Sequence, residues 1–233
     1  MTGRLVHSPA VQKDAATVQA MFSGIVPRYD FLNHLLSLNI DRLWRRRAAA
    51  LARPRGPVLD VCTGTGDLAA AMAAVAGRTV LGLDFCGPML RRGKDKRSCA
   101  RVRFLRGDAL RLPIPTGRFD VVSVGFGIRN VADLDGGLRE MVRVARPGGR
   151  IAILEFTRPR GRLMRFYVGR VLPFIGNVVT RSRAYTYLNR SVAAWATEAE
   201  LRERMLRAGC ASVTVHPLVF GIAAVHLGVK AGG

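Results

Sequence analysis

The stretch VLDVCTGTGDLA, residues 58–69, sets the fold class that the sequence predicts. A short apolar run that contains the acid Asp60 comes first. A loop of small residues follows, and an alanine-rich segment comes next. This order is typical of a buried strand, a tight turn and a helix. Gly64 and Gly66 allow positive φ and let a ligand approach the backbone closely. The stretch therefore indicates a strand–loop–helix unit that can bind a ligand at its loop.

The same alternation continues along the chain. Short apolar runs followed by helix-like segments favour a parallel sheet in a doubly wound, Rossmann-like α/β fold. Apolar residues stand at both odd and even positions of these runs, which suits strands that are covered on both faces. The expected strands are 58–61, 79–84, 102–108, 119–126 and 149–156, and the expected helices between them are 69–76, 87–97 and 134–146.

Two helical segments precede this core. Apolar residues at helical spacing predict helices in residues 14–37, divided at Pro27, and a further helix at residues 38–51. We therefore expect an N-terminal helical segment at residues 14–51 and a cofactor-binding core at residues 58–156, both within a single domain that spans residues 1–233.

The C-terminal part begins with an arginine-rich insertion, residues 157–196, which we expect to be a cap. Thr197 and Glu200 then form a capping-box pattern for a helix that stops near Gly209. Two strands, at about 212–216 and 221–229, close the chain as an antiparallel hairpin within the segment 197–230.

Composition narrows the class of protein. A chain of 233 residues with 49% hydrophobic residues suits a globular domain. The four cysteines contain no CxxC pair and the four histidines lack metal-ligand spacing, so we expect no metal, no disulfide framework and a cytoplasmic location. The N-terminus lacks the apolar core of a signal peptide, and no apolar run reaches the roughly 18 residues that span a bilayer.

The net charge of +21 implies an anionic neighbour, either nucleic acid or an acidic lipid surface. No acid lies between Glu155 and Glu198, while eight arginines do. Apolar and aromatic residues among the arginines of residues 158–195 suit peripheral contact with an anionic membrane. Two alternatives remain. The source of this chain could use arginine heavily in all of its proteins, which would raise the net charge without a functional reason. The cap could also pack on the core and leave a solvated basic rim.

Acids follow the expected strands at the edge where a doubly wound sheet binds ligands. Asp84 ends the second strand about 20 residues beyond the glycine loop, where a carboxylate can accept hydrogen bonds from ribose hydroxyls. Asp108 follows the third strand, beside Ala109. Either acid alone could be a helix cap. Together with the loop they predict a nucleoside pocket.

The loop leaves more than one ligand open. The P-loop pattern GxxxxGK[ST] is absent, whereas the dinucleotide pattern GxGxxG tolerates Ala69 at its third glycine. Asp60 discriminates better, because an acid there would repel a pyrophosphate. It could instead reach the α-amino group of S-adenosylmethionine, which carries a sulfonium and no phosphate.

The residues resemble a known family. D-x-x-x-G-T-G at 60–66 is similar to the first motif of class I S-adenosylmethionine-dependent methyltransferases, with Cys62 where many of them have glycine. FGIRNVAD at 126–133 and RYDxxN at 28–33 resemble the menaquinone/ubiquinone biosynthesis C-methyltransferases. The likeness runs from about residue 18 to residue 230 through the segments 21–46, 119–156, 185–210 and 221–230.

The resemblance implies methylation of a ring carbon of a polyprenylated quinol. We expect demethylmenaquinol to be the acceptor, with the benzoquinol of ubiquinone synthesis as the alternative. It also implies S-adenosylmethionine contacts at Thr65, Asp84, Asp108 and Ala109, besides those expected at Asp60, Gly64 and Gly66. Some relatives have a contacting serine at the position of Gly125, which lacks that hydroxyl.

Other functions use the same scaffold. A nucleic-acid methyltransferase would explain the charge, but no RNA-binding module is visible and the fourth strand ends in GFGIRN rather than an N/D-P-P-Y motif. We therefore expect no nucleic-acid partner. A non-catalytic membrane-surface protein is a further alternative, and a homo-oligomer remains open.

Arg129 and Asn130 follow the fourth strand at the edge that faces the acceptor. A quinol carbon becomes a good nucleophile when the neighbouring hydroxyl loses its proton, and positive charge favours that phenolate. We expect Arg129 to stabilise the phenolate through water and Tyr29 to close over the methionine end of the cofactor. The alternatives are that Arg129 pairs with Asp133 four residues on and that Tyr29 is a core residue.

Overall fold

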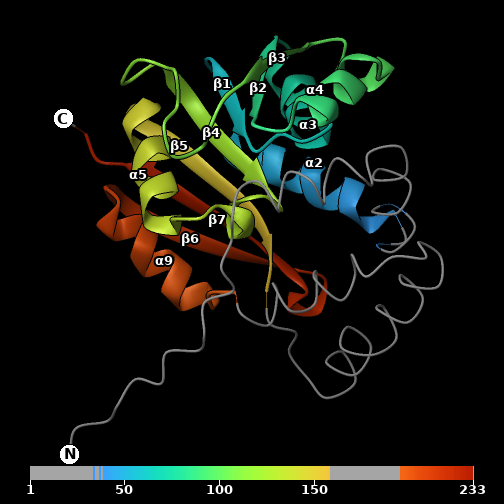
Figure 1. Cartoon of the computed structure of the whole chain (residues 1–233). Coiled ribbons are helices and arrows are strands. Elements are labelled where there is room, and N and C mark those ends of the chain that lie inside the picture. The colour runs from blue at the N-terminus through green and yellow to red at the C-terminus, as the bar shows by residue number, and fades with distance from the viewer. Residues whose placement is uncertain (1–33, 35–36, 38, 158–194, 233) are drawn as a thin grey trace, which may run out of the picture.

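The computed structural model describes residues 34, 37, 39–157 and 195–232, and it shows a seven-stranded sheet with helices on both faces (Figure 1). The strand order is β3-β2-β1-β4-β5-β7-β6. Strands β1 to β5 are parallel, and β7 runs antiparallel between β5 and β6. The strands are β1 (Val58–Val61), β2 (Val80–Asp84), β3 (Val102–Arg106), β4 (Phe119–Gly125), β5 (Ala145–Phe156), β6 (Cys210–Leu218) and β7 (Ala223–Lys230).

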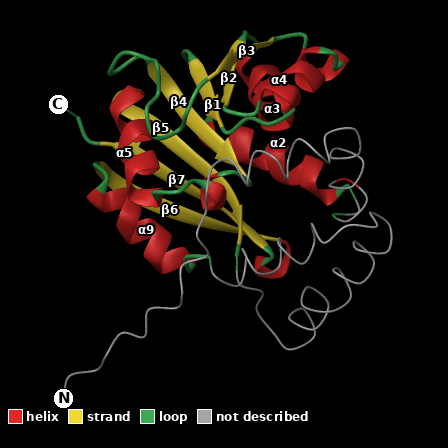
Figure 2. Cartoon of the chain, in the orientation of Figure 1, coloured by secondary structure: helices red, strands yellow, loops and turns green. Residues whose placement is uncertain are grey.

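The helices cover the sheet in two groups. On one face lie α2, α3 and α4, and on the other lie α5 and α9 (Figures 1 and 2). Three short 3-10 turns, η1, η2 and η4, join some of these elements. The helices are α2 (Ile40–Ala52), α3 (Asp67–Ala76), α4 (Gly87–Lys94), α5 (Leu134–Val144) and α9 (Glu198–Arg207), and the turns are η1 (Arg97–Cys99), η2 (Ile128–Asn130) and η4 (Val219–Gly221).

The core lies on both faces of the sheet because successive strand residues point in opposite directions. In β1, Val58 belongs to the cluster under α2 and α3, whereas Leu59 belongs to the cluster under α5 and α9. The same alternation separates Val121 from Val122 in β4. These residues are essentially inaccessible to solvent. Continuous apolar strands are therefore what this two-sided burial requires.

The order of the strands creates a switch point between β1 and β4. From β1 the chain proceeds outward to β2 and β3, and it then returns to β4 on the other side of β1. In such a sheet the loops after the two central strands leave in opposite directions, and a crevice opens at their carboxyl ends. The loop after β1 and η2 after β4 lie at this edge.

The structure confirms the doubly wound α/β fold and its C-terminal hairpin. The capping box is also confirmed: the Thr197 hydroxyl accepts a hydrogen bond from the Glu200 N–H, and the Glu200 carboxylate accepts one from the Thr197 N–H. One difference from the expected boundaries is the end of β3, which falls at Arg106 rather than at residue 108. A second lies in the hairpin: β6 extends two residues beyond each expected end, whereas β7 starts two residues later and ends one residue later than expected. Gly221, expected in a strand, lies in η4 with a φ of 75°.

A third difference lies at the junction of α5 and β5. We expected the helix to continue to Arg146 and the strand to start at residue 149, but α5 ends at Val144 and β5 starts at Ala145. Pro147 explains the early end, because proline disfavours helical conformations in the residue before it. Ala145 instead pairs with Phe119, with a register shift before the next pair.

Several expectations lie outside the described residues: the helices within 14–37 apart from isolated positions, and the cap from 158 to 194. Among the described helices, none combines the length and apolarity needed to cross a bilayer.

Candidate active site

The loop between β1 and α3 turns tightly because three of its residues have positive φ. Cys62, Gly64 and Gly66 have φ values of 52°, 57° and 87°. The Thr63 N–H donates to the Leu83 carbonyl over 2.9 Å, and the Gly66 N–H donates to the Thr63 carbonyl over 2.9 Å. The loop is thus bonded both to β2 and to itself, at the carboxyl edge of the sheet.

Cys62 is the unusual member of this loop, because a side chain in the left-handed region is strained. Gly127 makes room for it: a Cβ added at Gly127 would lie 2.5 Å from the Cys62 Cβ. Burial raises the pKa of the Cys62 thiol well above its ordinary value, and the charges of Asp84, Asp60 and Asp108 raise it further. The three acids expected from the sequence therefore gather around this loop.

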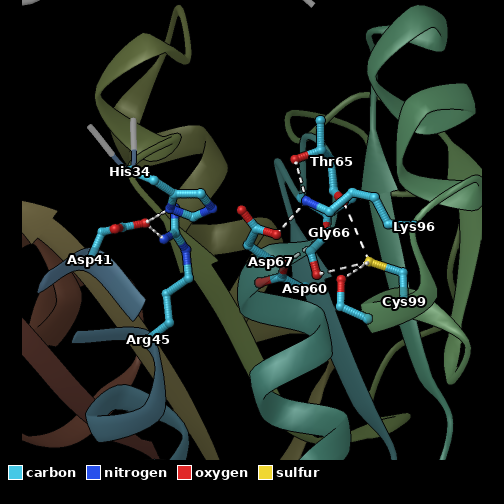
Figure 3. Close-up of polar contacts among 11 residues, drawn as sticks. His34, Asp41, Arg45, Asp60, Thr65, Gly66, Asp67, Lys96 and Cys99 are labelled. Atoms are coloured by element: carbon cyan, nitrogen blue, oxygen red, sulfur yellow. Dashed lines mark hydrogen bonds and ion pairs between the residues drawn. The ribbon is translucent and has the colours of Figure 1, made fainter. Parts of the chain in front are cut away.

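Lys96 and Cys99 contact the loop at Thr65 and Gly66 (Figure 3). The Cys99 thiol donates to the carbonyls of Thr65 and Gly66 over 3.5 and 3.6 Å. The Lys96 ammonium donates to the Thr65 hydroxyl over 3.2 Å and pairs with the Asp67 carboxylate. Because Lys96 is paired with Asp67, its charge is not placed to hold a phosphate. The loop edge has the acidic character that suits a cationic ligand.

Asp60 lies in β1 and is 1% exposed. Its carboxylate accepts hydrogen bonds from the Thr63 hydroxyl over 2.6 Å and the Ser123 hydroxyl over 2.7 Å. Burial raises the pKa of Asp60 to about 6, against the lowering effect of these two hydroxyls. Gly82 on β2 is needed for this arrangement, because a Cβ there would lie 2.9 Å from the Thr63 hydroxyl.

Asp84 ends β2, and its carboxylate links the loop after β1 to the segment after β2. One carboxylate oxygen accepts from the Gly64 N–H and the other from the Cys86 N–H, each over 2.8 Å. Burial nevertheless raises the pKa of Asp84. Each oxygen of an ionised carboxylate has a further lone pair, so the side chain can still accept from a ligand.

Asp108 and Ala109 follow β3 at the same edge. Asp108 is exposed and accepts a hydrogen bond from the Leu110 N–H over 2.9 Å, whereas Ala109 is buried. At Gly125 an added Cβ would lie 3.0 Å from Leu68, so a serine there would require Leu68 to move.

Arg129 forms a buried ion pair with Glu155, the penultimate residue of β5. Its Nη1 donates to the Glu155 carboxylate over 2.5 Å and to the Phe126 carbonyl over 2.7 Å, and its guanidinium lies 5.4 Å from the Phe156 ring centroid. Burial raises the pKa of Glu155, and Arg129 acts against that rise. The cation is therefore held in one orientation near the end of β4.

The alternative in which Arg129 pairs with Asp133 is wrong, because Asp133 instead lies 3.7 Å from Arg139. Asn130 is the last residue of η2, next to Arg129. Tyr29 lies outside the described residues.

An aromatic cluster forms between α2 and the ends of β4 and β5. The ring centroids of Phe126 and Phe156 are 4.6 Å apart, and Trp44 lies 6.1 and 6.3 Å from them. Arg45 lies over the Phe126 ring, with 5.6 Å from its guanidinium carbon to the centroid. Two arginines, Arg45 and Arg129, thus stack on neighbouring rings of one cluster.

Sequence reasoning missed Ser123, Glu155 and Arg45. Ser123 meets Asp60 because β1 and β4 pair in register at these two residues, which no local pattern reveals. Glu155 is the last acid before a long acid-free stretch, a signal that we read for charge and not for pairing. For Arg45 a signal was present: Asp41 and Arg45 are four residues apart in a predicted helix, a spacing that allows the ion pair that the structure shows.

Comparisons with known proteins point to one family. Residues 10–230 match the ubiE/COQ5 methyltransferase family. A demethylmenaquinone methyltransferase of Thermus thermophilus is 47% identical over 218 residues, covering 89% of this chain and 99% of that protein. A ubiquinone/menaquinone biosynthesis C-methyltransferase of Geotalea daltonii is 41% identical over 225 residues, covering 91% and 96%.

A solved structure from Thermotoga maritima, described as an S-adenosylmethionine-dependent methyltransferase and possible histamine N-methyltransferase, superposes with a TM-score of 0.67. It covers 91% of this chain and 99% of its own length at 21% identity, which supports the fold alone. The fold is that of a class I methyltransferase. More narrowly, the chain belongs to the ubiE/COQ5 methyltransferase family.

The cofactor of this enzyme is S-adenosylmethionine. The site fits it: Asp60, Asp84 and Asp108 put negative charge around a loop that would otherwise attract phosphate, and the cofactor is cationic and phosphate-free. Within the described residues, no cluster of His, Cys, Asp and Glu could hold a metal ion.

Gly127→Ala is expected to destabilise the loop, because the new Cβ would lie 2.5 Å from that of Cys62. We expect a loss of about 1–3 kcal/mol in the free energy of unfolding, typical of overpacking. Cys62→Gly combined with Gly127→Ala should recover most of it, since the opposing Cβ is gone and a φ of 52° suits glycine. Denaturant unfolding measures both. Gly137→Ala, where an added Cβ meets ordinary contacts of 3.5 Å or more, is the control; an equal loss in the double variant would contradict this account.

The pKa of Asp60 predicts a pH-dependent affinity. Above about pH 6 the carboxylate is ionised and attracts an ammonium group, and as the pH falls through 6 it takes up a proton and loses that attraction. We expect S-adenosylhomocysteine affinity, measured by calorimetry, to fall by up to about tenfold from pH 7.5 to pH 5. Asp60→Asn should bind more weakly at pH 7.5 and lack this dependence. An equal fall in the variant would assign the titration to another group, such as Asp84.

Proposed function

We propose that this protein methylates a ring carbon of demethylmenaquinol to give menaquinol. The observation that carries the proposal is the near-full-length similarity to a demethylmenaquinone methyltransferase, together with a loop and acids that fit the cofactor. When bound, S-adenosylmethionine supplies a methyl group on a positively charged sulfur. The residues of the chain hold both partners and stabilise the ionised acceptor.

On the cofactor side, each group suits a different part of the molecule. Asp60 suits the α-ammonium group, because it is a buried carboxylate near the loop. Asp84 suits the ribose hydroxyls, since both of its oxygens can accept further hydrogen bonds. The loop of Gly64, Thr65 and Gly66 lets the cofactor approach the backbone closely. Asp108 and Ala109, which follow β3, suit the adenine.

On the acceptor side, Arg129 stabilises the phenolate that forms when the quinol loses a proton. Its orientation is fixed by Glu155 and by the Phe126 carbonyl, so the cation needs little rearrangement as charge develops on the acceptor. Asn130, the next residue, offers a second donor to the same oxygen. The rings of Trp44, Phe126 and Phe156 provide an apolar wall suited to an aromatic acceptor.

The benzoquinol of ubiquinone synthesis is the second candidate acceptor. It is favoured by one observation, the Geotalea daltonii relative whose name covers both pathways. The higher identity to a demethylmenaquinone methyltransferase favours the naphthoquinol.

Label transfer tests the proposal. Incubation with methyl-labelled S-adenosylmethionine and demethylmenaquinol should place the label in the quinol, and the demethylated benzoquinol should react more slowly. Label in RNA and in neither quinol would overturn the assignment.

In the same assay Arg129→Ala should lower kcat by about 10²–10³-fold, as for loss of one charge-stabilising donor. Raising the pH should restore part of its rate, because the quinol then ionises unaided; calorimetry with S-adenosylhomocysteine shows whether the variant is folded.

A prenylated acceptor lies in a membrane, so we propose that the protein works at the cytoplasmic face of an anionic bilayer. Besides the basic segment 158–195, the described helix α2 carries an outward face suited to this contact. On it Leu43 is 63% exposed among the exposed Arg42, Arg46 and Arg47. Apolar residues flanked by arginine bind anionic interfaces.

Vesicle binding tests this location. The full chain should sediment with vesicles that contain phosphatidylglycerol and not with pure phosphatidylcholine. Raising the salt to about 1 M, where charges are screened within about 3 Å, should release it. Equal binding to both vesicles, or binding to neither, would contradict an electrostatic attachment.

A further inference from the structure

Arg45 is a buried cation at the edge of the cofactor site. It is 9% exposed, and its guanidinium lies over Phe126, the residue directly after β4. In Figure 3 its side chain stands with Asp41 and His34 on one side of the view, Lys96 and Cys99 stand on the other, and Asp60 and Asp67 are seen between. The charge of Arg45 reaches Asp60, because it lowers the pKa of that carboxyl against the effect of burial.

Asp41 fixes the position of Arg45. The Asp41 carboxylate pairs with Nη1 of Arg45, accepts from the Ser37 hydroxyl over 2.6 Å, and lies 2.8 Å from Nδ1 of His34. Burial alone would raise the pKa of Asp41, but the Ser37 hydroxyl and Arg45 outweigh it and lower the pKa. Among the described residues, only Nη1 of this guanidinium has a hydrogen-bond partner. Nε and Nη2 therefore have capacity for a second anion.

Arg45 and Asp60 are opposite charges that lie near enough for Arg45 to lower the pKa of Asp60, and within the described residues they form no ion pair with each other. Each is instead bonded to its own partners, Arg45 to Asp41 on α2 and Asp60 to hydroxyls on the loop and β4. A buried cation and a buried anion kept apart in this way suit a ligand that carries both charges. An α-amino acid does so, with an ammonium and a carboxylate on one carbon.

We propose that Arg45 binds the α-carboxylate of the cofactor's methionine part while Asp60 receives its α-ammonium. The inference rests on the cofactor assignment within the proposed function. Asp41 is a positioning residue that acts through Arg45. The pair selects adenosyl ligands that carry an amino acid over adenosyl ligands that lack one.

Two ligands isolate this contact in the full-length protein. S-adenosylhomocysteine carries the amino acid, and 5′-methylthioadenosine has the same adenosine and thioether without it. By calorimetry, Arg45→Met should weaken S-adenosylhomocysteine binding by about 10- to 100-fold, the range for a hydrogen bond to a charged group. Binding of 5′-methylthioadenosine should change by less than about twofold, which also shows that the variant is folded.

Matched variants sharpen the comparison. Arg207→Met removes an exposed arginine on α9, at the other face of the sheet, and should change neither affinity. Arg45→Lys should retain part of the preference for S-adenosylhomocysteine, and Asp41→Asn should lose part of it. If Arg45→Met does not fold, Arg45→Lys and Asp41→Asn provide the same test.

The outcomes separate this inference from the proposed function. Equal weakening of both ligands, or no weakening of either, would overturn the role of Arg45 and leave the cofactor assignment intact. Unchanged affinities with slower methyl transfer would place Arg45 on the acceptor side and overturn the inference. Wild-type protein that binds neither ligand would overturn the cofactor assignment and this inference with it.

Discussion

A carboxylate in the middle of a buried strand organises this molecule. Asp60 lies in β1 with almost no solvent exposure, and an ionised group in that position is costly unless hydrogen bonds compensate it. Thr63 and Ser123 supply those bonds, which ties the glycine loop and β4 to β1. The compensation is incomplete, because the pKa stays raised to about 6. A cationic ligand group near this carboxylate would complete the compensation, and in the proposed function the α-ammonium group of the cofactor would do so.

Two cationic side chains near the same edge of the sheet are likewise held by fixed partners. Arg129 with Glu155, and Arg45 with Asp41, are paired, buried or nearly so, and stacked on rings of one aromatic cluster. Buried ion pairs add little net stability, since desolvation offsets their attraction. Their value here is orientation: each cation is fixed before substrate arrives. Methyl transfer depends chiefly on alignment, and in the proposed function these fixed charges and stacked rings would supply it.

Sequence patterns predicted the parts of this structure that local chemistry determines. The strands, the glycine loop and the capping box at Thr197 follow from apolar runs, small residues and side-chain hydrogen bonding over a few positions. The strand-end acids were also found, because their position along the chain fixes their position on the sheet. What could not be predicted depends on pairing between distant segments. Ser123 reaches Asp60 through the register of β1 and β4, and Glu155 reaches Arg129 only after β5 is placed beside β4.

Cys62 shows what such an environment does to a reactive atom. A thiolate in a loop that holds an electrophilic methyl donor would be a competing nucleophile, and alkylation of that sulfur would inactivate the enzyme. Burial and three nearby acids keep the thiol protonated at neutral pH. The acids that suit a cationic donor therefore also suppress the thiolate that such a donor could alkylate.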